Sequence, residues 1–139
     1  MTDSYNGCVN PADVQAIAKA HGLLLLLRFG SSVTGRVHAA SDIDLAVLFE
    51  RVPDSFGPLA DLTADLQKLF PDRKVDVAVL NHADPLVLKQ VTEHCEFVYG
   101  ALRRLAEFKM YAFKRYQDHR RYLDMERAYV DRAIGAMTR

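Results

Sequence analysis

The sequence predicts an α/β fold, in which helices pack on a small β-sheet. Three apolar stretches of strand length, Leu23–Phe29, Asp42–Phe49 and Lys74–Leu80, support this prediction. Between and after them lie stretches in which apolar residues recur every three or four positions, the period of an amphipathic helix. Strands that alternate with such helices are typical of an α/β sandwich.

The chain has the length and composition of one globular domain. It has 139 residues, of which 50% are hydrophobic and 26% charged. We therefore expect a single domain over residues 1–139, with a core at about 11–100 and a C-terminal helical segment at about 101–137.

The first helix and strand are marked by cap and turn residues. Asn10 is a favoured helix cap and Pro11 suits the first helical position, so a helix is predicted to begin there and to end near Gly22. The apolar run LLLLLRF that follows, Leu23–Phe29, predicts a buried strand. Its pattern alone is also compatible with a buried helix.

The second strand, Asp42–Phe49, carries charge inside an apolar run. Side chains alternate between the two faces of a strand. Asp42 and Asp44 are therefore predicted to share one face and Ile43, Leu45 and Val47 the other.

Turn residues from Pro53 to Pro58 precede a predicted helix from Leu59 to Phe70, which Pro71 ends. The β-branched stretch Lys74–Leu80 predicts the third strand. A short helix from Leu86 to His94 and a short edge strand over residues 96–100 are expected next.

The C-terminal segment is predicted to be helical from Ala101 to about Met137. It contains no proline, and its one glycine is Gly135. The pattern is compatible with one long helix or with two abutting helices. Aromatic and basic residues are frequent in it, a composition typical of interfaces, so a surface for a partner is expected here as readily as a solvated face.

Charge and cysteine content exclude several classes of protein. The 18 basic and 18 acidic residues balance, so we expect neither direct nucleic-acid binding nor attraction to membranes. Cys8 and Cys95 are too few for a disulfide framework and fit reduced thiols in the cytoplasm. No signal peptide is expected, and the run Leu23–Leu27 is too short to span a bilayer.

Three strand aspartates, Asp42, Asp44 and Asp76, are the candidate catalytic and metal-binding residues. A neighbouring strand can bring Asp76 beside the other two, where the three charges repel one another and raise the pKa values of the group. A divalent cation relieves this repulsion, and ligands that are all oxygen favour Mg²⁺ or Mn²⁺. Such a site suits phosphoryl or nucleotidyl transfer.

The alternative for these aspartates is purely structural. Asp42 would cap a turn, Asp44 would pair with an arginine, and Asp76 would face solvent. We consider this alternative much weaker for the three together than for any one of them.

The loop that ends the first strand is the candidate phosphate site. Gly30 lets a backbone approach a phosphate closely, and the Ser31 hydroxyl can donate to its oxygens. Ser41 and Arg36 are further candidates for contact with the nucleotide. We expect Arg28, Arg73 and Lys74, which also lie near, to be solvated surface charges rather than phosphate ligands.

The pattern Gly30-Ser31, ten residues, then Asp42-Ile43-Asp44, with Asp76 as third carboxylate, resembles the DNA polymerase β-type nucleotidyltransferases. The chain is most similar to the minimal nucleotidyltransferases called MNT antitoxins, which are encoded beside HEPN toxins. The resemblance covers about Leu23 to Leu80.

This resemblance implies a fold, an activity and a partner. The fold would be a small mixed sheet with flanking helices and a C-terminal helix. The chain would transfer AMP from ATP to a tyrosine hydroxyl of a HEPN-type RNase toxin encoded by the adjacent gene, with Mg²⁺ or Mn²⁺ as cofactor. Asp42, Asp44 and Asp76 would hold the metal, and Asp76 would help to deprotonate the hydroxyl.

Two alternatives stay open at this point. The chain could neutralise its partner by binding alone, although three intact aspartates disfavour a decayed site. It could also modify a small molecule such as an aminoglycoside. Enzymes of that kind usually have an additional helical domain, for which this chain leaves little room.

Overall fold

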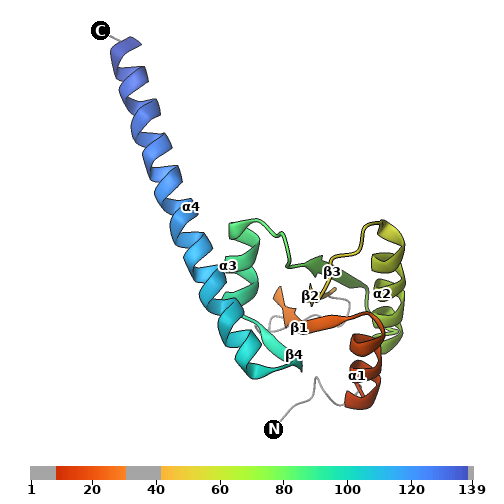
Figure 1. Cartoon of the computed structure of the whole chain (residues 1–139). Coiled ribbons are helices and arrows are strands. Elements are labelled where there is room, and N and C mark those ends of the chain that lie inside the picture. Colours follow the sequence, from red (N-terminus) through yellow and green to blue (C-terminus); the bar gives the residue numbers. More distant parts are fainter. Residues whose placement is uncertain (1–8, 31–41, 138–139) are drawn as a thin grey trace.

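The computed structural model describes residues 9–30 and 42–137, which form four strands and four helices (Figure 1). In chain order the elements are α1 (Pro11–Ala20), β1 (Leu23–Phe29), β2 (Ile43–Phe49), α2 (Phe56–Leu69), β3 (Val75–Val79), α3 (Pro85–Glu93), β4 (Glu96–Gly100) and α4 (Leu102–Met137). The α/β prediction is confirmed.

The sheet is mixed, as expected, with the strand order β3-β2-β1-β4. β1 runs antiparallel to both of its neighbours, whereas β2 and β3 are parallel. The beginnings of β2 and β3 therefore lie at the same edge as the end of β1. Phe29, the last residue of β1, is the register partner of Asp44.

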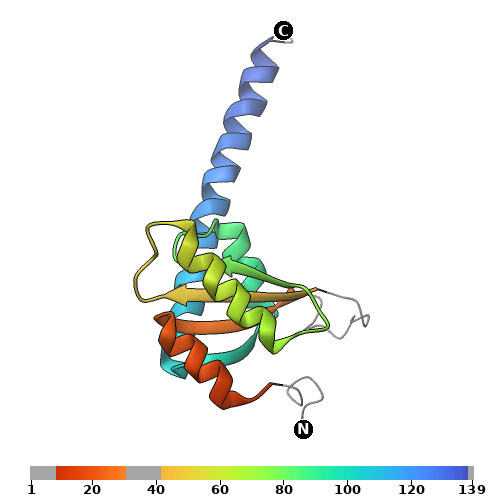
Figure 2. The same cartoon turned by 90° about the vertical axis from the view of Figure 1, so that its right-hand side faces the viewer.

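Helices cover both faces of the sheet (Figures 1 and 2). On one face α1 and α2 contribute Val14, Leu62 and Leu66 to a cluster that includes Ile43 and Leu45. On the other face the packing residues of α3 and α4 are Leu88, Val91, Phe108 and Ala112. Ile43, Leu45 and Val47 share a face as predicted, each at most 1% exposed.

Two helices, α1 and α3, begin at side chains that cap them. The Asn10 side chain accepts a hydrogen bond of 2.9 Å from the Ala12 N–H, and Asp84 accepts one of 2.8 Å from Leu86. α2 begins at Phe56, three residues before the predicted start, so the prediction of a turn up to Pro58 was wrong. Proline is tolerated there because the first turn of a helix needs no N–H donor.

The C-terminal segment is one helix, α4, of 36 residues. At 1.5 Å rise per residue its length is about 54 Å. It packs on α3 and β1 near its start, and its distal half stands clear of the sheet and of the other helices (Figures 1 and 2). Among the helices of the described residues, none combines the length and the apolar character needed to cross a membrane.

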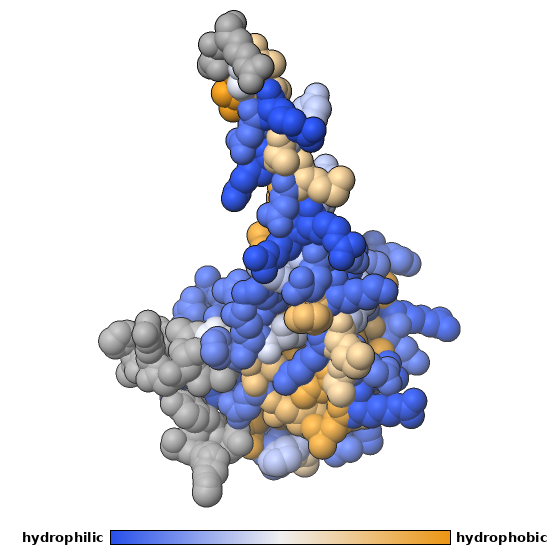
Figure 3. All heavy atoms as spheres, turned by 90° about the vertical axis from the view of Figure 1, so that its left-hand side faces the viewer, coloured by the Kyte–Doolittle hydropathy of each residue, from blue (hydrophilic) through white to orange (hydrophobic). Residues whose placement is uncertain are grey.

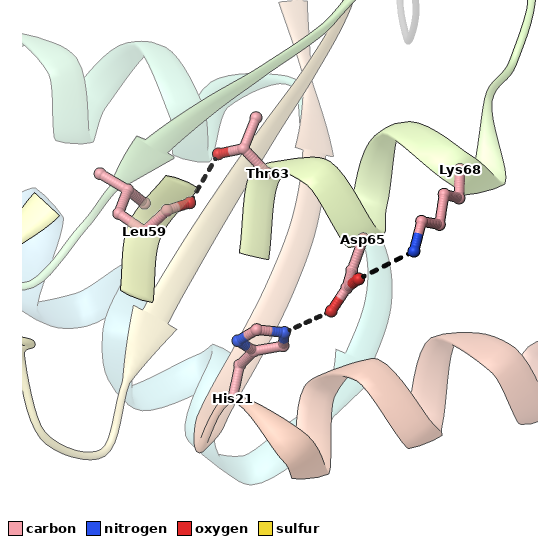
Figure 4. A network of polar contacts seen from close by, with 5 residues as sticks. All are labelled: His21, Leu59, Thr63, Asp65 and Lys68. Atoms are coloured by element: carbon pink, nitrogen blue, oxygen red, sulfur yellow. Dashed lines mark hydrogen bonds and ion pairs between the residues drawn. The ribbon is translucent and has the colours of Figure 1, made fainter. Parts of the chain in front are cut away.

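A polar network joins α1 to α2 (Figure 4). His21, the C-cap of α1, lies with Nε2 2.7 Å from Oδ2 of Asp65 in α2. Lys68 Nζ lies 3.6 Å from the other Asp65 oxygen. The hydrogen bond to His21, followed by the charges of His21 and Lys68, lowers the pKa of Asp65. The network therefore favours ionised Asp65 in the fold.

We predict that Asp65→Asn reduces the loss of stability on acidification. Because the folded pKa of Asp65 is below its ordinary value, its contribution is present above the unfolded pKa and is lost as pH falls through the folded value. Urea unfolding at a series of pH values should give a shallower acid slope for the variant.

The matched control is Asp61→Asn, which removes an exposed carboxylate from the same helix. Its acid slope should follow that of the wild type. Equal slopes for all three proteins would contradict a stabilising role of the His21–Asp65 contact.

Candidate active site

The candidate active site lies where parallel strands β2 and β3 begin. Asp44 and Asp76 are register partners in this pair, so their side chains leave the sheet side by side on the same face. Asp44 is half-buried, and the Asp76 side chain is 50% exposed. Asp42 is exposed and immediately precedes β2.

Like charges surround the Asp44 carboxylate. Burial raises the pKa of Asp44 above its ordinary value, and the negative charges of Asp76 and then Asp42 raise it further. All three predicted carboxylates thus interact electrostatically. The fold holds Asp44 and Asp76 side by side, an arrangement that a cation would favour, with Asp42 just before β2.

Gly30 closes the site from the end of β1. Its φ of +84° lies in the left-handed region that favours glycine. A Cβ at this position would lie 3.3 Å from Cγ of Asp44 and would overlap its Oδ2. A side chain at position 30 would therefore displace this carboxylate, whereas glycine lets the end of β1 lie against it.

Lys74 is the basic residue paired with the site. Its Nζ lies 3.9 Å from Oδ1 of Asp76, and its carbonyl accepts a 2.8 Å hydrogen bond from the Ile43 N–H. The side chain is 72% exposed, as expected for a solvated charge, so the ion pair contributes little stability.

Two amides that the sequence did not single out hold the turn before β3 and the end of β2. Gln67 of α2 donates to the carbonyls of Phe70, at 2.8 Å, and Arg73, at 2.5 Å, and accepts from the Val75 N–H at 3.0 Å. Asn81 exchanges two hydrogen bonds, of 2.8 and 2.9 Å, with the backbone of Phe49. Their only sequence signal is an amide side chain close to a strand end.

Arg28 is buried, so its prediction as a surface charge was wrong. It is 4% exposed and lies between the sheet and α1 and α2, among Val14, Leu45 and Leu66. Its guanidinium carbon lies 6.0 Å from the centroid of the Phe70 ring. The alternation along β1 directs it away from the face that carries Asp44.

The donor chemistry fits a hard divalent cation. Asp44 and Asp76 offer carboxylate oxygens from adjacent strands, and their mutual repulsion is the feature that a cation relieves. Over residues 9–30 and 42–137, no three Asp, Glu, His or Cys side chains are gathered tightly enough to hold a metal ion. The structure thus pairs Asp44 with Asp76 and leaves Asp42 adjacent. Ser31, Arg36 and Ser41 lie outside the described residues.

Three solved structures similar to this chain are of toxin–antitoxin complexes. The first is a toxin–antitoxin crystal structure with AMP-PNP, with a TM-score of 0.70 and 25% identity over 91% of this chain and 98% of that chain. A second is the tri-AMPylated Shewanella oneidensis HEPN toxin in complex with MNT antitoxin, with a TM-score of 0.63 and 22% identity over 89% and 94% of the two chains. A third is the toxin–antitoxin MntA-HepT, with a TM-score of 0.63 and 22% identity over 89% and 95%.

A comparison with curated protein sequences gave no match. The family model described as polymerase beta, nucleotidyltransferase, matches residues 13–103, which is more than half of the chain. These residues include the paired strands, Gly30 and all three aspartates. The chain therefore belongs to the polymerase beta nucleotidyltransferase family.

Proposed function

We propose that this chain is an antitoxin that transfers AMP from ATP to a tyrosine hydroxyl of a HEPN-type toxin encoded by the adjacent gene. The observation that carries the proposal is the pairing of Asp44 with Asp76 beside Gly30 in a member of a nucleotidyltransferase family. Similar chains occur in a complex with AMP-PNP and in one with a tri-AMPylated HEPN toxin. Because MNT denotes a minimal nucleotidyltransferase, this chain corresponds to the antitoxin of such a pair.

The reaction that we propose replaces a phosphoanhydride bond of ATP by a phosphate ester bond to tyrosine. The tyrosine oxygen attacks the α-phosphorus of ATP, the bond from that phosphorus to the β-phosphate oxygen breaks, and pyrophosphate leaves. The proton of the hydroxyl passes to the carboxylate of Asp76, which is half-exposed and so accessible to an acceptor. Alignment of the acceptor with the phosphate supplies much of the catalysis.

We propose that Asp42, Asp44 and Asp76 hold Mg²⁺ or Mn²⁺ in this reaction. When bound, the cation neutralises the carboxylates and the phosphate oxygens and stabilises the charge that develops on them. Gly30, Ser31, Ser41 and Arg36 are the residues that we expect to contact the nucleotide. The cytoplasm, where ATP and Mg²⁺ are available, is the proposed location.

The direct test is transfer of label to the partner. We expect that incubation with α-labelled ATP, Mg²⁺ and the product of the adjacent gene labels that protein on tyrosine. Asp44→Asn should lower the rate at least a hundredfold, because it removes charge stabilisation of the kind that contributes about 3 kcal/mol or more to a transition state. A mass increase of one or more AMP units on a tyrosine-containing peptide, located by peptide mass spectrometry, identifies the acceptor.

Two results would contradict the proposal. Label that appears only on added small molecules, such as aminoglycosides, would assign a small-molecule enzyme. Full protection of cells by the double variant Asp42→Asn and Asp44→Asn would show neutralisation by binding alone.

A second prediction concerns the charge of Asp44 in the free protein. Its raised pKa means that the native state binds more protons than the unfolded state between the ordinary and the raised value, so stability falls as pH rises through that window. Asp44→Asn removes this fall, and above the window the free variant should melt at a higher temperature than the wild type.

Ligand should reverse this order. At a hundredfold excess over its dissociation constant, Mg-ATP stabilises a native state by about 2.7 kcal/mol, which corresponds to a rise of several degrees in a domain of this size. Wild type and the control Asp118→Asn, on the exposed part of α4, should show that rise, and Asp44→Asn should lose most of it. An equal shift in all three would place the ligand elsewhere.

A third prediction separates backbone strain from steric exclusion at the site. Gly22 and Gly30 both have positive φ, of 66° and 84°, but an added Cβ at Gly22 meets nothing within 4 Å. Gly22→Ala should therefore cost about 1–2 kcal/mol of stability and keep AMP transfer. Gly30→Ala should abolish transfer, because its methyl group displaces the Asp44 carboxylate. Transfer assays and urea unfolding on both variants measure this, and similar activities would contradict the close packing of Gly30 on Asp44.

A further inference from the structure

The distal part of α4 is exposed along its length. Every residue from Arg120 to Ile134 is exposed, and both views show this stretch standing clear of the body (Figures 1 and 2). The proximal part is different, because Phe108 and Ala112 are buried against Leu88 and Val91 of α3. One continuous helix therefore has a half that packs on α3 and a half that is largely exposed.

The stripe of α4 that packs on α3 and the sheet continues into the exposed half of the helix. In the packed half the stripe consists of Leu105, Phe108, Ala112, Tyr116 and His119, all buried or partly buried. Steps of three and four residues extend the same stripe to Leu123, Glu126, Val130, Ile134 and Met137, which we call the α4 seam. Residues at such steps share a helix face.

The α4 seam is apolar except at one position. Leu123 and Val130 are 45% and 44% exposed and Met137 is 84% exposed, whereas Glu126 places a carboxylate between them. Tyr122 and Tyr129, seven residues apart, flank the seam and are 64% and 69% exposed. Figure 3 shows apolar side chains among charged ones along the protruding helix.

Such a face is costly for a free helix. Helical stability in water comes mainly from packing of an amphipathic face, and short unpacked helices are marginal. Contiguous exposed apolar surface marks an interaction site. Anchors at steps of three, four and seven residues are the pattern by which one helix recognises another.

The charges on the distal part of α4 indicate which kind of molecule can bind the α4 seam. Residues 120–137 contain four arginines and three acidic residues, too balanced for a helix that binds anionic lipid. A second copy paired in register would bury Glu126 against Glu126, and two desolvated like charges oppose such a dimer. A different helix with a basic residue opposite Glu126 avoids this repulsion.

We propose that the α4 seam binds a helix of the toxin-type partner, which presents apolar side chains to Leu123 and Val130 and a basic side chain to Glu126. The identity of the partner rests on the proposed function. The chain of the complex that contains AMP-PNP matches 91% of this chain. The 9% of this chain that is not matched amounts to about 13 residues. Because residues 120–137 number eighteen, the match includes part of the distal helix that carries the α4 seam.

The test is a binding titration without ATP, with the adjacent-gene product as the probe. The double variant Leu123→Asp and Val130→Asp should raise the dissociation constant at least tenfold. Its control, Gln117→Asp and Ala128→Asp, adds the same charge to exposed positions on the opposite face and should bind as wild type does. Circular dichroism checks that both variants keep the helix.

A single charge reversal tests the polar position of the seam. Glu126→Lys should weaken binding, whereas Asp124→Lys, which lies on the opposite face, should not. Binding that is unaffected by Glu126→Lys would contradict the basic contact.

Two variants distinguish a failure of partner binding from a failure of AMP transfer. Asp44→Asn should lose AMP transfer and keep its affinity for the partner, while the double seam variant should keep its thermal response to Mg-ATP. Unchanged affinity of the seam variant, or no binding of wild type to the partner, would overturn the docking proposal. Light scattering gives a further contradicting result: a wild-type dimer that the seam variant abolishes while its affinity for the partner stays intact. The seam would then bind a second copy of this chain.

Discussion

The parallel pairing of β2 and β3 places two carboxylates side by side, and the site depends on this contact. Asp44 and Asp76 occupy the same register position on adjacent strands, where their charges repel. An isolated strand pair could slip to separate them. The rest of the fold acts against that slip, since a shift by one residue would also turn Ile43 and Leu45 out of the core.

Hydrogen bonds at both ends of the pair reinforce this register. Gln67 holds the turn before β3, and Asn81 holds the end of β2. Gly30 then lets the end of β1 lie directly against Asp44. These residues keep the two carboxylates side by side, where their charges repel, and a cation would relieve that repulsion.

The sequence predicted those parts of the fold that depend on local patterns. Alternation along Asp42–Phe49 identified the buried face, and Asn10 with Pro11 identified the start of α1. It did not predict the contacts of Gln67 and Asn81 at the ends of β3 and β2, because these side chains meet their partners only in the folded chain. Burial of Arg28 was missed for a similar reason: the arginine lies in an apolar layer formed by distant helices, against the ring of Phe70.

The candidate active site and the α4 seam lie in different parts of the molecule. The carboxylates lie at one edge of the sheet, on short strands fixed by backbone pairing, where small displacements would matter for phosphoryl chemistry. The distal half of α4 extends from the helical layer on one face of the sheet and exposes Leu123, Tyr129 and Val130. Under the proposed function the acceptor is a tyrosine of another protein, and a long helix packed on the sheet domain would orient that protein. Binding on α4 would therefore supply specificity as well as affinity, because only a protein that fits the helix would present its hydroxyl to Asp76.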